Sequence, residues 1–224
     1  MSWDPVWEAV FSSREWGKYP AEELIRFIAK RFYSVPIEDR RYLKVLEIGC
    51  GPGANLWYCA REGLAVYGVD GSQSAVKQAQ ARLNDEVSGW EGKFSIGDIS
   101  SLDYPADYFD AVIDNEAVCC NSFESSQTIY SEAARVLKKG GAIFVRTFAD
   151  GSYGDGSGQQ IGDDAYLCSD GPLAGKGFAR FTKFERIPEL LGPAFKITSV
   201  ELLSMTCNDR SDAFKEWIIT GEKE

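Results

Sequence analysis

The sequence lacks histidine altogether, and this absence restricts the chemistry available to the protein. Histidine is the usual general base near neutral pH and the common partner of cysteine in mixed zinc sites. None of the six cysteines belongs to a C-x-x-C pair. We therefore expect reduced thiols, most of them buried, and no bound metal. Any general base must be Asp, Glu, Tyr, Lys or Cys.

The sequence is also poor in basic residues and in long apolar runs. Its 24 Lys and Arg against 34 Asp and Glu leave a formal charge of -10. That charge repels a phosphate backbone, so nucleic acids and anionic membranes are not expected as partners. No apolar run approaches the roughly 20 residues of a membrane span. The amino terminus carries acids among its apolar residues, unlike a secretory signal, so we expect a cytoplasmic protein.

The order of apolar and β-branched residues predicts one α/β domain over residues 1–224. Residues 5–33 carry apolar and aromatic residues at helical spacing in two pieces, and we expect residues 1–40 to form an N-terminal helical cap. From Leu43 onward, β-rich runs alternate with helical patterns, as in a parallel sheet. The expected order is strand LKVLEIG, helix 54–62, strand LAVYGVD, helix 74–84, strands KFSIGD and FDAVID, helix 124–138 and strand AIFVRTF.

The C-terminal third has a different composition. Residues 149–180 hold eight glycines among Asp, Ser and Gln, which predicts a long loop without its own core, acting as a mobile lid or substrate loop. After a short helix at 184–191, two β-rich runs at 195–206 and 213–223 are joined by CNDRSD, which is too short for a crossover helix. We therefore predict a seven-stranded, mostly parallel sheet with a C-terminal antiparallel hairpin and helices on both faces.

A glycine-rich turn, Glu47-Ile48-Gly49-Cys50-Gly51-Pro52-Gly53, follows the first strand. Glycines let the main chain turn sharply and approach a ligand at the carboxyl end of a central strand, where open α/β sheets bind ligands. The looser dinucleotide fingerprint also fits here. However, Glu47 would repel a pyrophosphate, Pro52 lacks a backbone donor, and the C-terminal hairpin replaces a further parallel unit. These features favour a nucleoside without phosphates.

The chain resembles the class I S-adenosylmethionine-dependent methyltransferases over nearly its whole length, in VLEIGCGPGAN, in the acid Asp70 after the second strand, in Gly97-Asp98-Ile99, in FDAVIDNEAV and in RVLKKGGAIFV. The resemblance implies a Rossmann-like fold, S-adenosylmethionine as cofactor and S-adenosylhomocysteine as product. It also implies methyl transfer to nitrogen or oxygen of a small-molecule acceptor by in-line displacement. WYCAREGLAVYGVDGS and PLAGKGF are similar to bacterial small-molecule methyltransferases.

The same resemblance assigns cofactor contacts. Asp70 is expected to accept both ribose hydroxyls, because a carboxylate matches two adjacent hydroxyls. Trp16 and Tyr19 are expected to close over the cofactor, whereas we expect Trp3 and Trp7 to pack the amino-terminal helices against the sheet. The expected cofactor-binding residues are Glu47, Gly49, Cys50, Gly51, Asn55, Asp70, Gly71, Ser72, Asp98, Ile99, Asn115, Trp16 and Tyr19.

Chemistry is expected beside Asp114-Asn115-Glu116, at the end of the fourth strand and next to the first strand. We expect Asn115 to contact the methionine part of the cofactor and Asp114 or Glu116 to face the substrate as the catalytic candidates; the alternative is that these acids only cap the loop. Methyl transfer needs alignment and exclusion of water more than acid–base groups. An amine or an ionised carboxylate therefore suits a chain without histidine, while a neutral hydroxyl would require Asp114, Glu116 or Tyr153 as base.

Two other functions are compatible with the sequence. A non-catalytic protein that binds S-adenosylmethionine would show the same motifs without turnover. An NAD-type oxidoreductase would use the looser dinucleotide fingerprint. We also allow for a homodimer.

Overall fold

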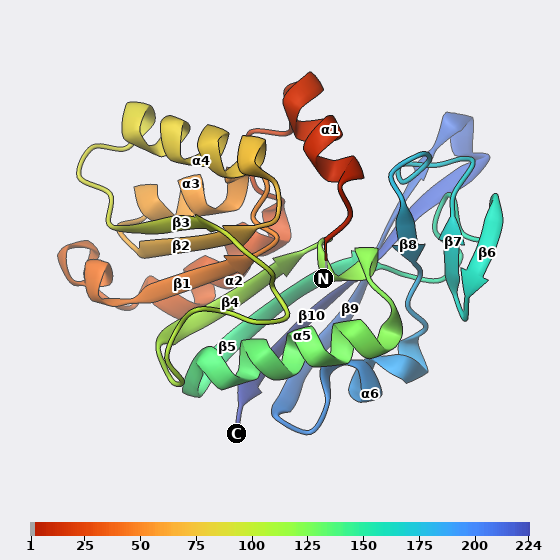
Figure 1. The fold of residues 1–224 in the computed structure, drawn as a ribbon. Coiled ribbons are helices and arrows are strands. Elements are labelled where there is room, and N and C mark those ends of the chain that lie inside the picture. Colours follow the sequence, from red (N-terminus) through yellow and green to blue (C-terminus); the bar gives the residue numbers. More distant parts are fainter. Residues whose placement is uncertain (1–2) are drawn as a thin grey trace.

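The computed structural model describes residues 3–224 and contains a seven-stranded sheet in the order β3-β2-β1-β4-β5-β10-β9 (Figure 1). The first five strands of this order are parallel, and β10 runs antiparallel to both β5 and β9. The predicted fold class is confirmed. The strands of this sheet are β1 Lys44–Ile48, β2 Ala65–Asp70, β3 Gly92–Ile96, β4 Phe109–Asn115, β5 Leu137–Phe148, β9 Phe195–Cys207 and β10 Asp212–Lys223.

Helices cover both faces of the sheet, and each buries a narrow apolar stripe. In α2, Leu24, Ile28 and Phe32 are spaced four residues apart and are all buried against the sheet. This face also holds α3 and α4, and the opposite face holds α5 and α6. The helices on the sheet are α2 Glu22–Phe32, α3 Ala54–Arg61, α4 Gln73–Glu86, α5 Phe123–Val136 and α6 Ile187–Leu191, with short 3-10 turns at Ile37–Tyr42, Val118–Cys120, Phe184–Arg186 and Asn208–Arg210.

The junction between α5 and β5 differs from the expectation that the helix continues to residue 138 and stops at a glycine pair. The helix ends at Val136, and β5 begins at once with Leu137, which is fully buried and pairs with Phe109 of β4. Lys138 forms an ion pair with Asp110 at 2.7 Å. Burial of Leu137 and pairing with β4 stop the helix here, because apolar burial outweighs a small difference in helix propensity.

Residues 149–180 do not form the coreless loop that their composition predicts. They contain a three-stranded antiparallel sheet of β6 Gln159–Gly162, β7 Ala165–Leu167 and β8 Phe178–Arg180. The prediction was wrong because a few apolar residues between the glycines converge on the end of β5 and on the turn after β4. The resulting cluster consists of Cys119, Phe148, Cys168, Leu173, Ala179 and Phe181.

The predicted N-terminal cap divides into two parts with different positions; residues 1 and 2 lie outside the described residues. Helix α2 packs on the sheet, whereas α1, Val6–Ser13, stands over the end to which the β1 and β4 arrows point (Figure 1). Glu8 fastens α1 to the start of α4: its carboxylate accepts hydrogen bonds from the hydroxyls of Ser72 and Ser74, each at 2.5 Å. Only α1 and the residues just after it therefore act as a cap.

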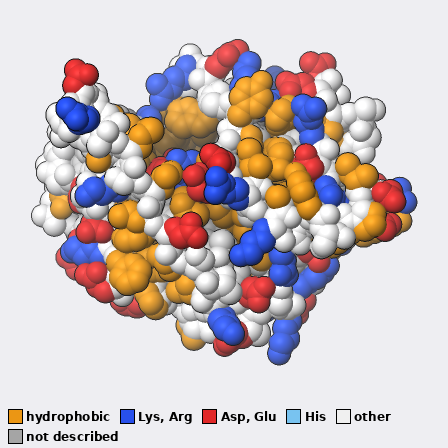
Figure 2. All heavy atoms as spheres, turned by 180° about the vertical axis from the view of Figure 1, so that it is seen from behind, with side chains coloured by type: hydrophobic (Ala, Val, Ile, Leu, Met, Phe, Trp, Pro, Cys, Tyr) orange, Lys and Arg blue, Asp and Glu red, His pale blue; other side chains and the backbone are white. Residues whose placement is uncertain are grey.

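All six cysteines are free thiols, and Cys50, Cys59, Cys119 and Cys168 are buried, as expected. Within residues 3–224, no helix is both long and apolar enough to cross a membrane. Figure 2 shows Lys and Arg side chains scattered among Asp and Glu on the face opposite to that of Figure 1. On this face the charges of the two signs are mixed.

Candidate active site

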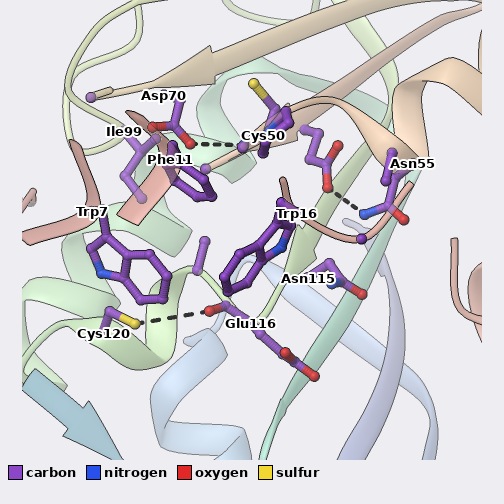
Figure 3. A pocket seen from close by; sticks show the side chains of 18 of the residues that line it. Trp7, Phe11, Trp16, Cys50, Asn55, Asp70, Ile99, Asn115, Glu116 and Cys120 are labelled. Carbon is purple, nitrogen blue, oxygen red and sulfur yellow. Dashed lines mark hydrogen bonds between the residues drawn. The ribbon is translucent and has the colours of Figure 1, made fainter. Parts of the chain in front are cut away.

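A cavity of about 310 Å³ lies at the ends of β1 and β4, where the strand order reverses (Figure 3). This is the position at which open α/β sheets bind ligands, and small-molecule sites measure roughly 300–1,000 Å³. Side chains from α1, from the loops after β1 to β4 and from residues 149–180 line it. Of the expected cofactor-binding residues, all but Ser72 and Asp98 line this cavity: Glu47, Gly49, Cys50, Gly51, Asn55, Asp70, Gly71, Ile99, Asn115, Trp16 and Tyr19.

The turn after β1 needs glycine at two positions for steric reasons. Gly49 and Gly53 have φ of 68° and 77°, in the region that favours glycine. A Cβ on Gly49 would overlap the side chain of Ala117, and one on Gly53 would lie 2.8 Å from the Cβ of Ala79. These glycines let the turn pack against the loop after β4 and against α4, so that its main chain forms the cavity wall.

Asp70 is held rigidly at the end of β2. One carboxylate oxygen accepts a hydrogen bond from the N–H of Gly51 and the other from the N–H of Ser72, both at 2.8 Å. The side chain is 6% exposed, and burial raises its pKa above the ordinary 3.8. The carboxylate lines the cavity, and its oxygens have further lone pairs to accept hydroxyl groups of a ligand.

Glu47 lies near the end of β1, and only one of its two carboxylate oxygens accepts a hydrogen bond from the described residues. Asn55 donates to Oε1 at 2.5 Å, whereas Oε2 is buried and has no hydrogen-bond partner among residues 3–224. Burial, together with the carboxylates of Asp70 and Asp114, raises the pKa of Glu47 to about 8. A buried carboxylate oxygen without a partner is costly, and a cationic donor on a ligand would relieve that cost. Asn115 Oδ1 is likewise buried without a partner at the cavity wall.

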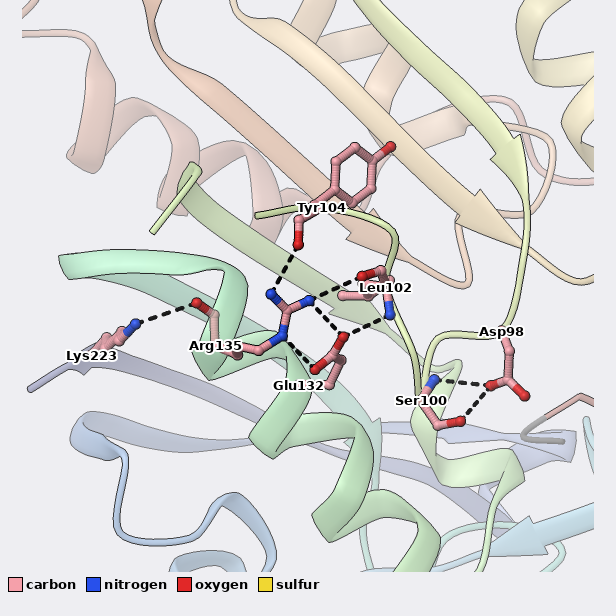
Figure 4. Close-up of polar contacts among 7 residues, drawn as sticks. All are labelled: Asp98, Ser100, Leu102, Tyr104, Glu132, Arg135 and Lys223. Carbon is pink, nitrogen blue, oxygen red and sulfur yellow. Dashed lines mark hydrogen bonds and ion pairs between the residues drawn. The ribbon is translucent and has the colours of Figure 1, made fainter. Parts of the chain in front are cut away.

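Asp98 does not line the cavity, although it is one of the expected cofactor-binding residues. Its carboxylate accepts hydrogen bonds from the N–H and hydroxyl of Ser100 at 2.9 and 2.7 Å, within its own turn (Figure 4). Its neighbours Gly97 and Ile99 do line the cavity. The turn that carries them is therefore at the site, but the Asp98 side chain stabilises the turn, as short acids commonly do.

Two side chains of α5 fix the segment that follows this turn (Figure 4). Arg135 donates to the carbonyls of Leu102 and Tyr104, each at 2.9 Å, and Glu132 accepts from the N–H of Leu102 at 2.7 Å. The segment between β3 and β4 is thus tied to the opposite face of the sheet.

Ser72 is also absent from the cavity lining. It is fully buried as the N-cap of α4, accepting from the N–H of Ala75 at 3.1 Å and donating to Glu8. Its contribution to the site is indirect, since its own N–H orients Asp70.

Asp114 does not face the cavity, which corrects its assignment as a catalytic candidate. It is fully buried and absent from the lining. Oδ2 accepts from the hydroxyl of Tyr130 at 2.7 Å, and Oδ1 accepts from the N–H groups of Ala117 and Val118 at 3.0 and 3.1 Å. Burial raises its pKa to about 6. The side chain fixes the loop after β4, and both of its oxygens are engaged in doing so.

Glu116 does line the cavity. Its φ is 62°, a left-handed conformation that is unfavourable for a residue with a side chain, and such residues cluster at functional sites. Its N–H donates to the carbonyl of Arg146 at 2.8 Å, and its carboxylate lies 3.3 Å from Arg146 Nε. Burial and the neighbouring Glu216 raise the pKa of Glu116 well above its usual range.

Aromatic side chains form the wall opposite Glu116 (Figure 3). The expectation that Trp3 and Trp7 pack against the sheet was wrong, because α1 stands over the cavity and both indoles line it. Trp7 stacks on Phe11 with ring centroids 5.7 Å apart, and Trp16 meets Phe11 edge-on at 5.4 Å. Tyr19 lines the rim and contacts Trp57. Trp7 and Phe11 stand four residues apart, the helical spacing by which sequence reasoning could have grouped them.

Several lining residues were not found from the sequence. Arg146 is one, although a single charge inside the apolar run AIFVRTF was a usable signal. Phe11 of α1 is another. The rest come from the turn after β4 or from residues 149–180, and the sequence did not assign them to the cavity one by one: Cys120, Asn121, Pro172, Leu173 and Lys176.

Residues 46–145 match the model of the methyltransferase domain family. The chain is 33% identical over 106 residues to the demethylmenaquinone methyltransferase of Tropheryma whipplei, covering 47% of this chain and 42% of that protein. It is 32% identical over 136 residues to the fatty-acid O-methyltransferase of Mycolicibacterium smegmatis, covering 59% and 47%. The chain thus spans less than half the length of these curated relatives.

Solved structures of the same fold cover most of the chain. Magnesium protoporphyrin IX methyltransferase from Synechocystis PCC 6803, determined with bound S-adenosylmethionine, has a TM-score of 0.64 at 17% identity and covers 90% of this chain and 78% of that one. A 4+2 cyclase, SpnF, has a TM-score of 0.66 at 20% identity and covers 98% and 91%. The fold is therefore shared by proteins whose names describe different reactions.

Proposed function

From the match of residues 46–145 to the methyltransferase domain model and from the fold, we propose that the chain is an S-adenosylmethionine-dependent methyltransferase that transfers a methyl group to a small-molecule acceptor. The observation that carries this proposal is the pair of buried acids in one cavity. Glu47, with an unpaired oxygen, and Asp70, held by two backbone donors, line the same space at the ends of β1 and β2.

These side chains fit the cofactor in chemical terms. The unpaired oxygens of Glu47 and Asn115 suit its α-ammonium group, and the Asp70 carboxylate suits its ribose hydroxyls. Gly97 and Ile99 supply backbone and apolar surface for adenine. A diphosphate has no hydrogen-bond donor for the unpaired oxygen of Glu47, which argues against a dinucleotide.

When bound, S-adenosylmethionine supplies a methyl group on a positively charged sulfonium, which needs only an aligned nucleophile. The chain's own part is therefore to align the acceptor and exclude water. Trp7, Phe11 and Trp16 form an apolar wall that limits access of water, and Glu116 and Arg146 provide the charged side chains opposite. We assign the acceptor to the side of the cavity that Glu116 faces.

Calorimetric titration tests the cofactor assignment. S-adenosylhomocysteine should bind with measurable heat, and oxidised nicotinamide dinucleotide should not. Tight binding of the dinucleotide alone would favour the oxidoreductase alternative and refute the proposal. Transfer of label from radioactive S-adenosylmethionine to a pooled acceptor library then tests turnover.

A non-catalytic role in binding the cofactor is the second candidate. The observations on Glu47 and Asp70 that carry the first proposal account for cofactor binding and do not themselves require turnover. The two candidates differ in one outcome: binding of S-adenosylhomocysteine without label transfer to any acceptor would support the second.

We further propose that the chain acts in the cytoplasm on a small molecule and not on nucleic acid. We also propose that residues 1–224 fold as one domain in which residues 149–180 serve as the lid. Sedimentation velocity distinguishes a monomer from a homodimer, and a gel-shift assay with duplex DNA and RNA tests the absence of a nucleic-acid partner.

A further inference from the structure

The acceptor side of the cavity carries two carboxylates and one guanidinium. Arg146 donates to Glu216 Oε2 from Nε at 3.0 Å and from Nη2 at 2.6 Å, while Glu116 lies 3.3 Å from the same Nε. Glu116 and Arg146 line the cavity, and Glu216 lies behind them with 7% of its side chain exposed. Two acids therefore share a single arginine.

Three elements bring these side chains together. Glu216 stands opposite Phe148 in the antiparallel β10–β5 pair, and Ile218 stands opposite Arg146. Arg146 and Glu216 are thus diagonal neighbours on one face of the sheet, where long side chains reach each other. Glu116 joins them from the loop after β4, held by its own N–H bond to Arg146. The arrangement is built by the backbone and does not depend on one flexible loop.

With both acids ionised, the cluster would be one positive charge short of neutrality. Within the described part of the chain, Glu116 forms an ion pair with Arg146 alone, and Arg146 directs both of its hydrogen bonds to Glu216. Lys176 also lines the cavity, but its ammonium donates to the carbonyl of Pro172 at 2.6 Å and lies over the Trp16 ring. The lining as a whole holds the acids Asp4, Glu47, Asp70 and Glu116 against the bases Arg146 and Lys176.

The aromatic wall of the cavity also favours a cationic ligand. Trp7, Trp16 and Glu116 line the same cavity, and in Figure 3 the main-chain end of Glu116 is nearer to the two indoles than its carboxylate is. The faces of indole rings attract cations, most strongly where water is excluded. Arg14 and Lys176 already lie over the Trp16 ring, 5.4 and 5.2 Å from its centroid, so this wall is one against which cations pack.

We propose that the methyl acceptor is an amine that enters the cavity as an ammonium ion and binds to Glu116. The inference rests on the methyltransferase function proposed above and names its substrate class. The ammonium passes one N–H proton to the Glu116 carboxylate. This transfer leaves a neutral amine with a free lone pair and a protonated carboxyl group, so atoms and charge balance.

The surroundings of Glu116 suit it as the proton acceptor. Burial and the carboxylate of Glu216 raise its pKa, whereas Arg146 lowers it. Cys120, which also faces it from the turn after β4, adds to the increase. A carboxylate with a raised pKa takes a proton from an ammonium group more readily than an exposed one does.

An ionised carboxylate acceptor fits this end of the cavity poorly. It would meet Glu116 with Glu216 behind it, and like charges disfavour binding in a partly desolvated site. On this point the cavity differs from what the name of the fatty-acid O-methyltransferase relative would suggest.

A label-transfer screen tests the substrate class. Separate pools of amines, of alcohols and phenols, and of carboxylic acids, matched in size, are offered with labelled S-adenosylmethionine. We expect label in the amine pool. Label only in the other pools, or none in any amine while S-adenosylhomocysteine binds, would overturn the inference. Failure of S-adenosylhomocysteine to bind would instead refute the proposed function itself.

A binding measurement tests the role of Glu116 without turnover. The best-labelled amine is titrated by calorimetry into protein saturated with S-adenosylhomocysteine. In Glu116→Gln we expect about ten- to a hundredfold weaker binding of the amine, the range of a lost charged hydrogen bond, and unchanged binding of S-adenosylhomocysteine. Glu189→Gln, at an exposed glutamate that pairs with Arg186, is the matched control and should alter neither.

A second variant separates the charge argument from a structural role. Glu216→Gln leaves Glu116 in place but removes the second acid that pairs with Arg146, so that the charge of Arg146 is balanced by Glu116 alone. The amine should bind less tightly in this variant too, and both variants should unfold at or above the wild-type temperature, because each removes a carboxylate from a crowded pair. Unchanged amine affinity in both variants would overturn the inference.

Discussion

Replacing Glu47 by glutamine should separate two effects of its buried carboxyl group. One is the loss of folding stability when the group ionises, and the other is its contribution to cofactor binding. Glutamine preserves the shape of the side chain and the hydrogen bond accepted from Asn55. It removes the ionisable group at the end of β1, whose second oxygen has no partner. The variant should therefore gain stability and lose affinity for the cofactor.

The size of the gain follows from the pKa of Glu47, which rises from an ordinary 4.5 to about 8 in the folded chain. Between these values the folded chain holds a proton that the unfolded chain has released. The contribution of Glu47 to stability therefore falls as the pH rises through this interval. At about 1.4 kcal/mol for each pH unit, the full difference is about 5 kcal/mol. The variant and the wild type should be equally stable in acid, and the variant more stable in alkali.

The assay is denaturant unfolding of both proteins at a series of pH values, with fluorescence of the tryptophans as the signal. Asp70 and Asp114 are present in both proteins, so their own titrations largely cancel in the difference. Parallel pH profiles of the two unfolding free energies would refute the reasoning, because they would mean that Glu47 releases its proton equally in both states.

Binding supplies the second half of the test. An ammonium group needs the ionised form of Glu47, so wild-type affinity for S-adenosylhomocysteine should rise up to about tenfold per pH unit below pH 8, with release of a proton. The glutamine variant should bind more weakly and show no such dependence. Calorimetry in buffers of different ionisation enthalpy measures the proton release, and its absence in the wild type would contradict the contact.

Three further predictions concern other parts of the site. Asp70→Ala should lose about 1.5–3 kcal/mol of S-adenosylhomocysteine binding, the usual range for hydrogen bonds to a charged group, and an unchanged dissociation constant would remove Asp70 from the ribose contact. Asp114→Ala should lose about 1–3 kcal/mol of unfolding free energy, because the hydroxyl of Tyr130 and the N–H groups of Ala117 and Val118 lose their acceptor, with cofactor affinity retained; a folded variant that binds cofactor but transfers no methyl group would restore Asp114 as a catalytic candidate. Limited proteolysis within residues 149–180 should slow when S-adenosylhomocysteine is bound, and equal rates with and without it would count against a lid.

The sheet and the cofactor half of the site could be predicted because their signals are local. Alternation of β-rich and helical runs from Leu43 predicts the parallel part of the sheet, and the structure supplies the order of its strands. The glycine turn after β1 and the acid Asp70 after β2 mark the ends of neighbouring strands, and such ends meet at one edge of the sheet. Their positions in the cavity follow from the topology alone.

The partners of Glu116 could not be predicted from the sequence because they meet only through tertiary packing. Arg146 and Glu216 are seventy residues apart in sequence and become neighbours through the pairing of β5 with β10. Asp114 and Glu116 stand two residues apart and look equivalent in the sequence. Only the left-handed turn at Glu116 sends one side chain into the cavity and leaves the other under the loop.

The three-stranded sheet within residues 149–180 was hidden by composition. Its glycines and polar residues suggest a chain with too little apolar surface to fold alone. Leu173 and Phe181 nevertheless pack in one cluster with Phe148 and Cys119. Part of the apolar core of this segment is therefore supplied by residues outside it, at the end of the large sheet. A composition-based prediction counts only the apolar residues within a segment and misses those supplied by its neighbours.

The hydrogen bonds by which Glu8 fastens α1 to the start of α4 determine which solvent conditions would move α1 away from the cavity. Its partners, the hydroxyls of Ser72 and Ser74, are uncharged, and their hydrogen bonds lower the pKa of Glu8. Added salt screens interactions between full charges and has little to act on here. Acidification, by contrast, neutralises the carboxylate itself and loosens the helix that carries Trp7 and Phe11. We therefore expect α1 to stay over the cavity at high ionic strength and to detach from it at low pH.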